Sequence, residues 1–393
     1  MHVPFCQRRC GYCAFATWSG LSHLWARYVR ACRLEVARAV EEGLGPATSV
    51  FFGGGTPSLL PAEMLTGLLG DLCSGLGLAT GAEVTVECNP ETLTPQLLRA
   101  YRQGGVTRLS FGVQSMVPHV LASLGRDHRP GSVVRAAAWA GEAGFEGAYS
   151  VDLIFGAAGE AMGDWEASLL GVLALDPPPV HVSAYALSVE PGTALARQPD
   201  RRPDDDDQAR KYALADEVLA SAGLEWYEIS NWARPGAECS HNLLYWSQGE
   251  YIGIGAAAHS HRVLPGGRAR RWWNVAQPER YCQRLEAGRA AEAAGETLGP
   301  AERQWEGLVL ALRTRTGVPA GALAPEVLES GLVELRPVGP PVAGRPAATR
   351  AVLTLQGRLL ANEVSLRLQA GAQGQLHRPR PEAASGAMVP LVP

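Results

Sequence analysis

Lysine is almost absent from this 393-residue sequence: Lys211 is the only one, and arginine carries nearly all of the basic charge. The formal net charge is -4, and no basic run alternates with aromatic residues as a nucleic-acid groove requires. We therefore expect no nucleic-acid partner. Hydrophobic residues make up 46% of the chain, which is enough to bury a sizeable core in a globular protein.

Long apolar runs are missing as well. No continuous apolar stretch is long enough to span a bilayer, and Arg8 and Arg9 stand where a signal peptide would have its apolar segment. The expected location is the cytoplasm, which is a reducing compartment. A disulfide framework is therefore not expected, although the chain contains 8 cysteines.

Three of the cysteines, Cys6, Cys10 and Cys13, crowd one short loop. A closed structural zinc site needs four protein ligands, usually as two separated pairs; no second pair follows, although His2 could complete a Cys3His set. A 4Fe-4S cubane held by three thiolates has a fourth iron that a small molecule can chelate. The spacing C-x3-C-x2-C is the radical S-adenosylmethionine (SAM) pattern, and it favours a 4Fe-4S cluster over zinc.

Short β-branched runs alternate with helix-like stretches up to about residue 230. Strands are predicted as a stub before Cys6 and at 49–52, 83–87, 106–113, 148–155 and 180–187, with helices such as 22–42 and 94–103 between them. Six βα units in a row indicate an α/β fold, a partial (β/α)6 barrel of the TIM type, because right-handed crossovers place helices outside a parallel sheet. On this scaffold, chemistry is expected where strands end.

The chain divides into four predicted regions: a barrel at 1–235, an aromatic and Gly-rich connecting region at 236–299, a small helical/β module at 300–370, and a tail at 371–393. The tail has too little periodic apolar content to fold, so we expect it to be disordered. The acidic run from Asp204 to Asp207 could bind a metal, but acids at the start of a helix complement its dipole, and we prefer that interpretation.

Gly-rich or polar groups follow successive predicted strands. Each of them alone is more typical of a structural role, and their recurrence at successive strand ends is what indicates a ligand site. The candidates are Gly54, Gly55 and Thr56 in FFGGGTPS, Glu87 in VECNPE, Gln114 in SFGVQS, Arg126 in LGRDH and Asp152 in SVDLIFG.

These blocks, together with HVPFCQRRCGYC and HVSAYALSVEPGT, resemble the radical SAM enzymes grouped with oxygen-independent coproporphyrinogen III oxidase (HemN). The likeness covers about residues 1–285 densely and continues more weakly to about 370. It implies that the cysteine trio holds the 4Fe-4S cluster. It also implies that Tyr12, Gly54, Gly55, Thr56 and Glu87 contact the cluster-bound SAM, and that Gln114, Arg126 and Asp152 match contacts to a second SAM.

Two branches of this family can be distinguished, the oxidase and a haem chaperone branch usually called HemW. The oxidase has a further Cys two residues after the third ligand, where this chain has Phe15. HNLLYW, residues 241–246, matches the H-N-x-x-Y-W motif of the chaperone branch. There His241 can supply an axial nitrogen to haem iron, with Cys239 as an alternative soft ligand. From the residues alone, a buried, hydrogen-bonded His241 among core aromatics is the simpler interpretation.

The resemblance therefore favours a haem chaperone that hands haem to respiratory haemoproteins, without requiring radical turnover. The competing hypotheses are oxidative decarboxylation of coproporphyrinogen III and a zinc-stabilised barrel that binds a partner. An electron donor for the cluster is also expected, and a homodimer remains open.

Two departures from common patterns affect these expectations. The family's aromatic-led strand before the first cysteine is reduced here to HVP, so the first strand is expected to be short and to lack the Tyr that contacts SAM. Either translation starts upstream or cluster binding is compromised. YIGIGAAAHS contains G-x-G-x-x-A but does not open a βαβ unit, so a dinucleotide site is rejected. We interpret Gly253 and Gly255 as a close backbone approach beside the SAM or haem site.

Overall fold

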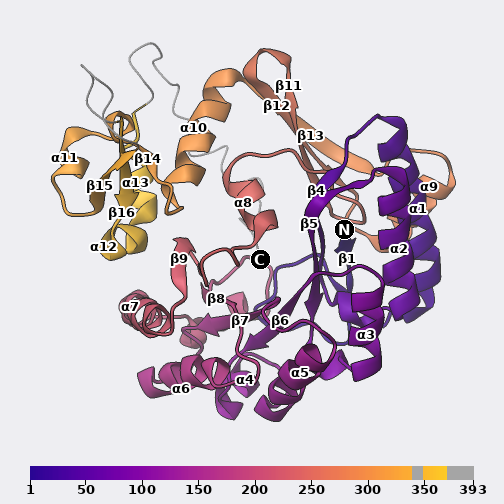
Figure 1. The fold of residues 1–393 in the computed structure, drawn as a ribbon, viewed down its shortest axis with the longest axis horizontal. Coiled ribbons are helices and arrows are strands. Elements are labelled where there is room, and N and C mark those ends of the chain that lie inside the picture. Colours follow the sequence, from indigo (N-terminus) through magenta and orange to yellow (C-terminus); the bar gives the residue numbers. More distant parts are fainter. Residues whose placement is uncertain (339–347, 370–393) are drawn as a thin grey trace.

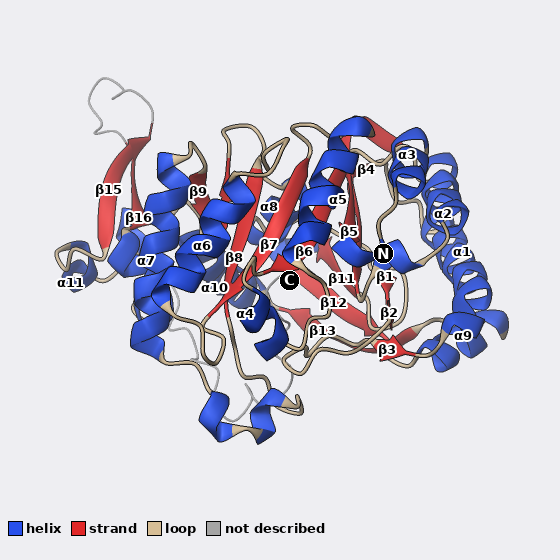
Figure 2. Cartoon of the chain, turned by 90° about the horizontal axis from the view of Figure 1, so that it is seen from below, coloured by secondary structure: helices blue, strands red, loops and turns tan. Residues whose placement is uncertain are grey.

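The computed structural model describes residues 1–338 and 348–369. Six parallel strands form the centre of the molecule: β1 (His2–Val3), β4 (Ala47–Gly54), β5 (Leu78–Cys88), β6 (Arg108–Gln114), β7 (Tyr149–Phe155) and β8 (His181–Ala186). They neighbour one another in chain order, and helices surround them on the outside (Figures 1 and 2). The predicted α/β fold with a partial barrel is confirmed.

The helices outside the sheet follow the predicted apolar periodicity. In α1 (Trp25–Glu41), Tyr28, Val29, Cys32 and Val36 are buried at spacings of three and four. The remaining helices of this layer are α2 (Ala62–Gly75), α3 (Pro95–Gln103), α4 (Pro118–Ser123), α5 (Pro130–Glu142), α6 (Met162–Leu173) and α7 (Asp205–Ser221).

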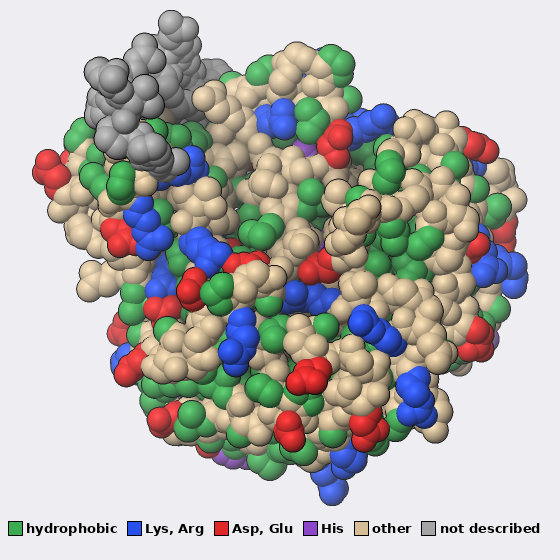
Figure 3. Space-filling model, in the orientation of Figure 1, with side chains coloured by type: hydrophobic (Ala, Val, Ile, Leu, Met, Phe, Trp, Pro, Cys, Tyr) green, Lys and Arg blue, Asp and Glu red, His purple; other side chains and the backbone are tan. Residues whose placement is uncertain are grey.

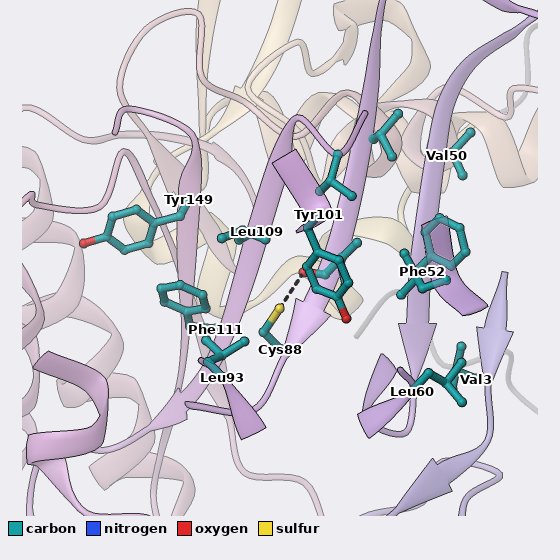
Figure 4. Packing of buried hydrophobic residues seen from close by; sticks show 14 of the residues in the cluster. Val3, Val50, Phe52, Leu60, Cys88, Leu93, Tyr101, Leu109, Phe111 and Tyr149 are labelled. Carbon is teal, nitrogen blue, oxygen red and sulfur yellow. Dashed lines mark hydrogen bonds between the residues drawn. The ribbon is translucent and has the colours of Figure 1, made fainter. Parts of the chain in front are cut away.

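The main core lies between the sheet and these helices. Val50 and Phe52 of β4, Leu109 of β6 and Tyr149 of β7 are buried, and Tyr101 of α3 packs on them (Figure 4). Alternate positions of the same strands face the barrel interior, because successive strand side chains point to opposite faces. The helical interpretation of the acidic run is confirmed: Asp204 caps α7, and its side chain accepts from the Asp207 amide at 2.7 Å.

Two strands that the sequence patterns did not indicate extend the sheet beyond β8. These are β9 (Glu225–Glu228) and β10 (Asn231–Ala233), and the full order is β1-β4-β5-β6-β7-β8-β10-β9. β10 pairs antiparallel with β8 and with β9. Each is very short, so neither shows the alternation that identifies a strand.

The region after β10 contains a short helix and a second sheet. Its elements are α8 (Ser240–Trp246), β11 (His259–Leu264), β12 (Arg268–Asn274), α9 (Pro278–Glu286) and β13 (Glu292–Leu298). Gly253 and Gly255 make close backbone approaches, as predicted, but to other parts of the chain; their position beside SAM or haem remains a prediction. Gly255 has φ +112°, and a Cβ there would lie 2.5 Å from both the His2 carbonyl oxygen and the Tyr28 hydroxyl. The glycine thus accommodates the first strand and α1.

The C-terminal residues form a small module with its own apolar core of Leu312, Val318, Ala351, Leu353 and Val364. Its elements are α10 (Pro300–Leu312), β14 (Val318–Pro319), α11 (Pro325–Leu328), β15 (Val333–Val338), β16 (Ala348–Leu353), α12 (Leu355–Leu359) and α13 (Ala361–Ser365). The module agrees with the predicted helical/β composition, whereas the predicted tail at 371–393 lies outside the described residues. The exact region boundaries remain predictions.

The surface shows no dominant charge on the face drawn in Figure 3, where basic and acidic side chains are interspersed. None of the helices within 1–338 and 348–369 has the length and apolarity needed to cross a membrane.

Candidate functional site

The cysteine trio lies on the loop that joins β2 (Phe5–Cys6) to β3 (Trp18–Ser19). These two strands pair in parallel and fix the base of the loop, and a hydrogen bond of 3.2 Å from the Cys13 amide to the Cys10 carbonyl tightens its turn. Cys6, Cys10 and Cys13 are each partly exposed. The loop therefore presents three thiols at the carboxyl ends of the parallel strands, where the fold places chemistry.

The electrostatics of the trio fit a cofactor that neutralises thiolates. Burial raises the pKa of the Cys6 and Cys13 thiols, and the charge of Cys10 raises each further. In the opposite direction, the Thr56 hydroxyl donates to Cys6 Sγ at 3.7 Å, which favours the thiolate. Ferric and ferrous iron bind thiolates, so a bound cluster would add positive charge directly at the three sulfurs, beyond that of the Arg126 guanidinium beside Cys10.

In the described part of the chain, no three metal-ligating side chains are placed so that they could hold a single metal ion. Each thiolate of a 4Fe-4S site binds a different iron, so its three sulfurs need not converge on one atom. The lack of a single-ion site among the described residues therefore does not argue against a cubane held at three corners.

The glycine run after β4 is explained first by close packing. A Cβ on Gly54 would lie 2.1 Å from the His2 ring, and one on Gly55 would lie 2.6 Å from the Phe5 carbonyl oxygen. The amides from Gly53 to Thr56 are all engaged: those of Gly53, Gly55 and Thr56 donate to carbonyls of the first strands, and that of Gly54 donates to Glu87. Contacts from this backbone to a cofactor would have to use carbonyl oxygens, which suit a cationic amino group.

Glu87 and Asp152 form an acidic pair inside the barrel. Burial, together with the charge of Asp152, raises the pKa of Glu87 to about 8. Burial also raises the pKa of Asp152, although hydrogen bonds from Ser183 and Ser110 oppose the shift. A ligand that brings positive charge between these carboxyls would be stabilised by both.

Gln114 and Arg126 meet over Gly112, because a Cβ on Gly112 would contact both side chains. Arg126 Nη2 donates to the Gly112 carbonyl at 2.9 Å, while Nη1 donates to Cys10 Sγ at 3.7 Å. Arg126 thus lies against the cysteine loop as well as the strand end. Tyr12 is also near this guanidinium, and burial raises the pKa of its phenol.

A polar barrel interior was not identified from the sequence. The strand pairing aligns alternate positions of neighbouring strands, with Thr85 beside Arg108 and Ser150 beside His181. Thr85 Oγ1, Arg108 Nη2 and His181 Nδ1 are buried without a hydrogen-bond partner in the protein. The signal was available, since polar residues recur at every second position of VTVE, RLSF and HVSAY.

His241 lies on α8, beside the amino half of β4 and away from the cysteine loop. Its ring stacks on Phe51 with centroids 4.9 Å apart. Both ring nitrogens have partners, with Nδ1 2.9 Å from Ser49 Oγ and Nε2 3.0 Å from Tyr245 Oη. Burial lowers the pKa of His241 to about 3, so the imidazole is neutral at physiological pH. Ligation of a metal would require one of these hydrogen bonds to break.

The structure therefore brings most predicted residues together and leaves His241 apart. The Cys trio, Tyr12, Thr56, Gln114 and Arg126 are linked through the contacts of the loop, and Glu87 and Asp152 face the adjoining interior. Cys239, the alternative soft ligand, is buried and donates to Glu83 Oε1 at 3.4 Å.

Comparisons with known proteins match this chain to radical SAM proteins. The Radical SAM superfamily model matches residues 1–170. "Heme chaperone HemW" of Mycobacterium tuberculosis is 42% identical over 383 residues, covering 93% of this chain and 92% of that protein. HemW of Escherichia coli is 36% identical over 299 residues, covering 75% and 78%. The solved coproporphyrinogen III oxidase (HemN) of Escherichia coli shares the fold, with a TM-score of 0.77 at 20% identity over 93% of this chain and 88% of that one.

Proposed function

Because the chain belongs to the HemW family of radical SAM proteins, we propose that it is a cytoplasmic haem chaperone. In this proposal it binds a 4Fe-4S cluster, SAM and haem, and hands the haem to acceptor haemoproteins. The observation that carries the proposal is the pair of motifs on one chain: the three-cysteine loop at the strand ends and HNLLYW on α8. The names of the HemW relatives support the haem-carrying role.

Cys6, Cys10 and Cys13 would hold the cluster, which supplies a one-electron centre and an open iron corner for SAM. Glu87 would face the positive charge of the cluster-bound SAM, and Thr56 orients Cys6 by its hydrogen bond. Gln114, Arg126 and Asp152 match contacts to a second SAM, and Gln114 and Arg126 would hold it over Gly112. His241 would supply a nitrogen ligand to haem iron; the imidazole is neutral, so no proton competes, but one of its two ring hydrogen bonds must first break.

Haem binding tests the role of His241. Titration of the anaerobic protein with haem should shift the Soret band, and His241→Ala should weaken that shift. Tyr245→Phe should act in the opposite direction, since it frees Nε2 from its hydrogen bond to the Tyr245 hydroxyl. His23→Ala, a change at an exposed histidine, is the matched control. A Soret shift that survives His241→Ala unchanged would remove His241 from the proposal.

The oxidase alternative predicts a product. Coproporphyrinogen III, SAM and a reductant added to the reconstituted protein should yield no substantial protoporphyrinogen if the chaperone proposal holds. Rapid formation of that product would replace the chaperone with the enzyme.

Glu87 should make SAM affinity depend on pH. Its pKa is raised from 4.5 to about 8 by burial and by Asp152, so before SAM binds the Glu87 carboxyl is protonated at pH 7. Between pH 4.5 and about 8 the folded chain binds more protons than the unfolded chain, so the contribution of Glu87 to stability falls as pH rises. Cationic SAM favours the ionised carboxyl, so binding should release a proton, and affinity should rise by up to roughly tenfold per pH unit below the raised pKa.

Calorimetry in buffers of different protonation enthalpy measures this proton release. Glu87→Gln should abolish the release and flatten the pH profile, while Glu91→Gln, at an exposed position just after β5, should change neither. A wild-type profile that is flat between pH 6 and pH 9 would contradict the placement of Glu87 at SAM.

A further inference from the structure

Four arginines lie on the cysteine loop and on the turns beside it. Arg8 and Arg9 are exposed on the loop itself, and no Asp or Glu precedes Glu35 in the sequence. Arg197 belongs to η4 (Leu195–Arg197), which is fastened to the loop by a hydrogen bond of 2.9 Å from the Leu195 amide to the Gly11 carbonyl. Arg201 ends η5 (Pro199–Arg201), the next turn of the chain. We call these four residues, Arg8, Arg9, Arg197 and Arg201, the arginine collar.

The charges of the collar are only partly balanced. Arg8 pairs with Asp127 at 2.8 Å, but both side chains are highly exposed, so the pair is weak. Asp200 is adjacent in sequence to Arg201 and offsets part of its charge. Within the described residues, Arg9, Arg197 and Arg201 have no carboxylate at ion-pair distance, and Arg201 instead donates to Ser123 and Gln198. The collar is therefore locally positive on a chain whose net charge is -4.

The collar borders a cavity of about 260 Å³ whose lining includes Arg8, Arg9, Tyr12 and Arg201 and, among the described residues, no acidic side chain. Phe15, on the same loop, is 36% exposed. Arginine and aromatic residues are both enriched at protein interfaces. Arg8, Arg9 and Arg197 are exposed, so the collar presents positive charge on the outer surface beside the loop, where the acidic surface of a protein partner can approach it.

We propose that the arginine collar is the docking surface for a small acidic electron-carrier protein, with a flavin or an iron-sulfur centre, that reduces the cluster. This inference rests on the proposed function, because it requires the cluster on Cys6, Cys10 and Cys13. One electron passes from the reduced carrier to the oxidised cluster, so the carrier is oxidised by one electron and no atoms are exchanged. The partly exposed loop allows the carrier to approach closely, and opposite charges steer the encounter.

The test is anaerobic stopped-flow reduction of the reconstituted protein by an acidic bacterial flavodoxin in its hydroquinone state. For the wild type, the second-order rate should fall at least tenfold between 50 and 500 mM salt, because exposed charges are screened. Arg9→Glu with Arg201→Glu should slow the reduction at low salt by at least roughly tenfold and should flatten its salt dependence.

The matched control is Arg234→Glu with Arg268→Glu, which makes the same change in net charge at exposed positions. The Arg234 amide donates to Val180 just before β8, at the end of the barrel away from the cysteine loop. This control should keep the wild-type rate. Reduction by dithionite, followed by electron paramagnetic resonance, should give equal signals in all three proteins.

Two results would overturn the docking surface while leaving the proposed function intact: a wild-type rate that does not depend on salt, or a collar variant reduced as fast as the wild type. Because the first result needs no variant, the inference stays testable even if the double substitution disturbs the loop. Failure of the proposed function looks different, since the wild-type protein would then contain no iron or sulfide after reconstitution.

Discussion

Cys10→Ser is expected to abolish the iron-sulfur centre. Changing a residue that merely orients a metal ligand costs roughly 10–100-fold in affinity, and loss of one of three ligands should cost far more. Serine is close to cysteine in size, and Cys10 is partly exposed, so the fold should survive the change. Iron and sulfide analysis after anaerobic reconstitution, with the visible absorbance of the cluster, measures the effect.

Cys73→Ser is the matched control for this experiment, because Cys73 is an exposed cysteine on α2, outside the loop. It should retain the wild-type iron content. If Cys10→Ser keeps an intact cluster, the three-thiolate assignment is wrong, and with it the open iron corner on which SAM binding depends.

The second large effect is expected at Lys211, the single lysine of the chain. Its Nζ is fully buried and donates to Glu160 Oε2 at 3.0 Å, to the Glu160 carbonyl at 2.8 Å and to Asp207 Oδ2 at 2.7 Å. Lys211→Met leaves the carboxyl of Glu160 buried without its cation, and removal of one partner of a buried pair costs about 3–5 kcal/mol. Chemical denaturation should show this loss in the free energy of unfolding.

The sign of the pH effect provides a further check on Lys211. Burial already raises the pKa of Glu160, and the ammonium group opposes that shift. Without the ammonium group the folded-state pKa rises further, so the defect of Lys211→Met should grow as pH increases through the new value. Adding Glu160→Gln should recover part of the stability.

Arg210→Met, at the residue just before Lys211 on the same helix, is the control. Arg210 is exposed, and its ion pair with Asp207 is long, at 3.6 Å, so loss of the pair should cost no more than about 1 kcal/mol. If both variants lose the same free energy of unfolding, the buried pair of Lys211 and Glu160 contributes no more to stability than the exposed pair of Arg210 and Asp207.

The parallel strands and the cysteine loop were predictable because their signals are local. A run such as SVFF or AYSVDLIF identifies a buried strand by itself, and C-x3-C-x2-C identifies its cofactor class without any distant contact. The alternation of strands and helices then fixes the topology through the handedness of crossovers. These elements appear at the predicted positions within a few residues.

The contacts of the individual site residues could not be predicted, because their partners are distant in sequence. Arg126 reaches Cys10 across 116 positions, and His241 reaches Ser49 across 192. The sequence predicts that Gly54 and Gly55 contact SAM, whereas the structure explains their lack of a Cβ by the packing of the first strands. Their contact with SAM remains a prediction, as do the roles of the other candidates.

The barrel is not closed, and this affects how a ligand can reach its interior. β1 and β9 are the two edges, and they do not pair with each other. The helix that carries His241, α8, lies against β4, the neighbour of the edge strand β1 (Figure 1). A closed barrel admits a ligand only along its axis, whereas a sheet whose two edge strands do not pair is free of that restriction.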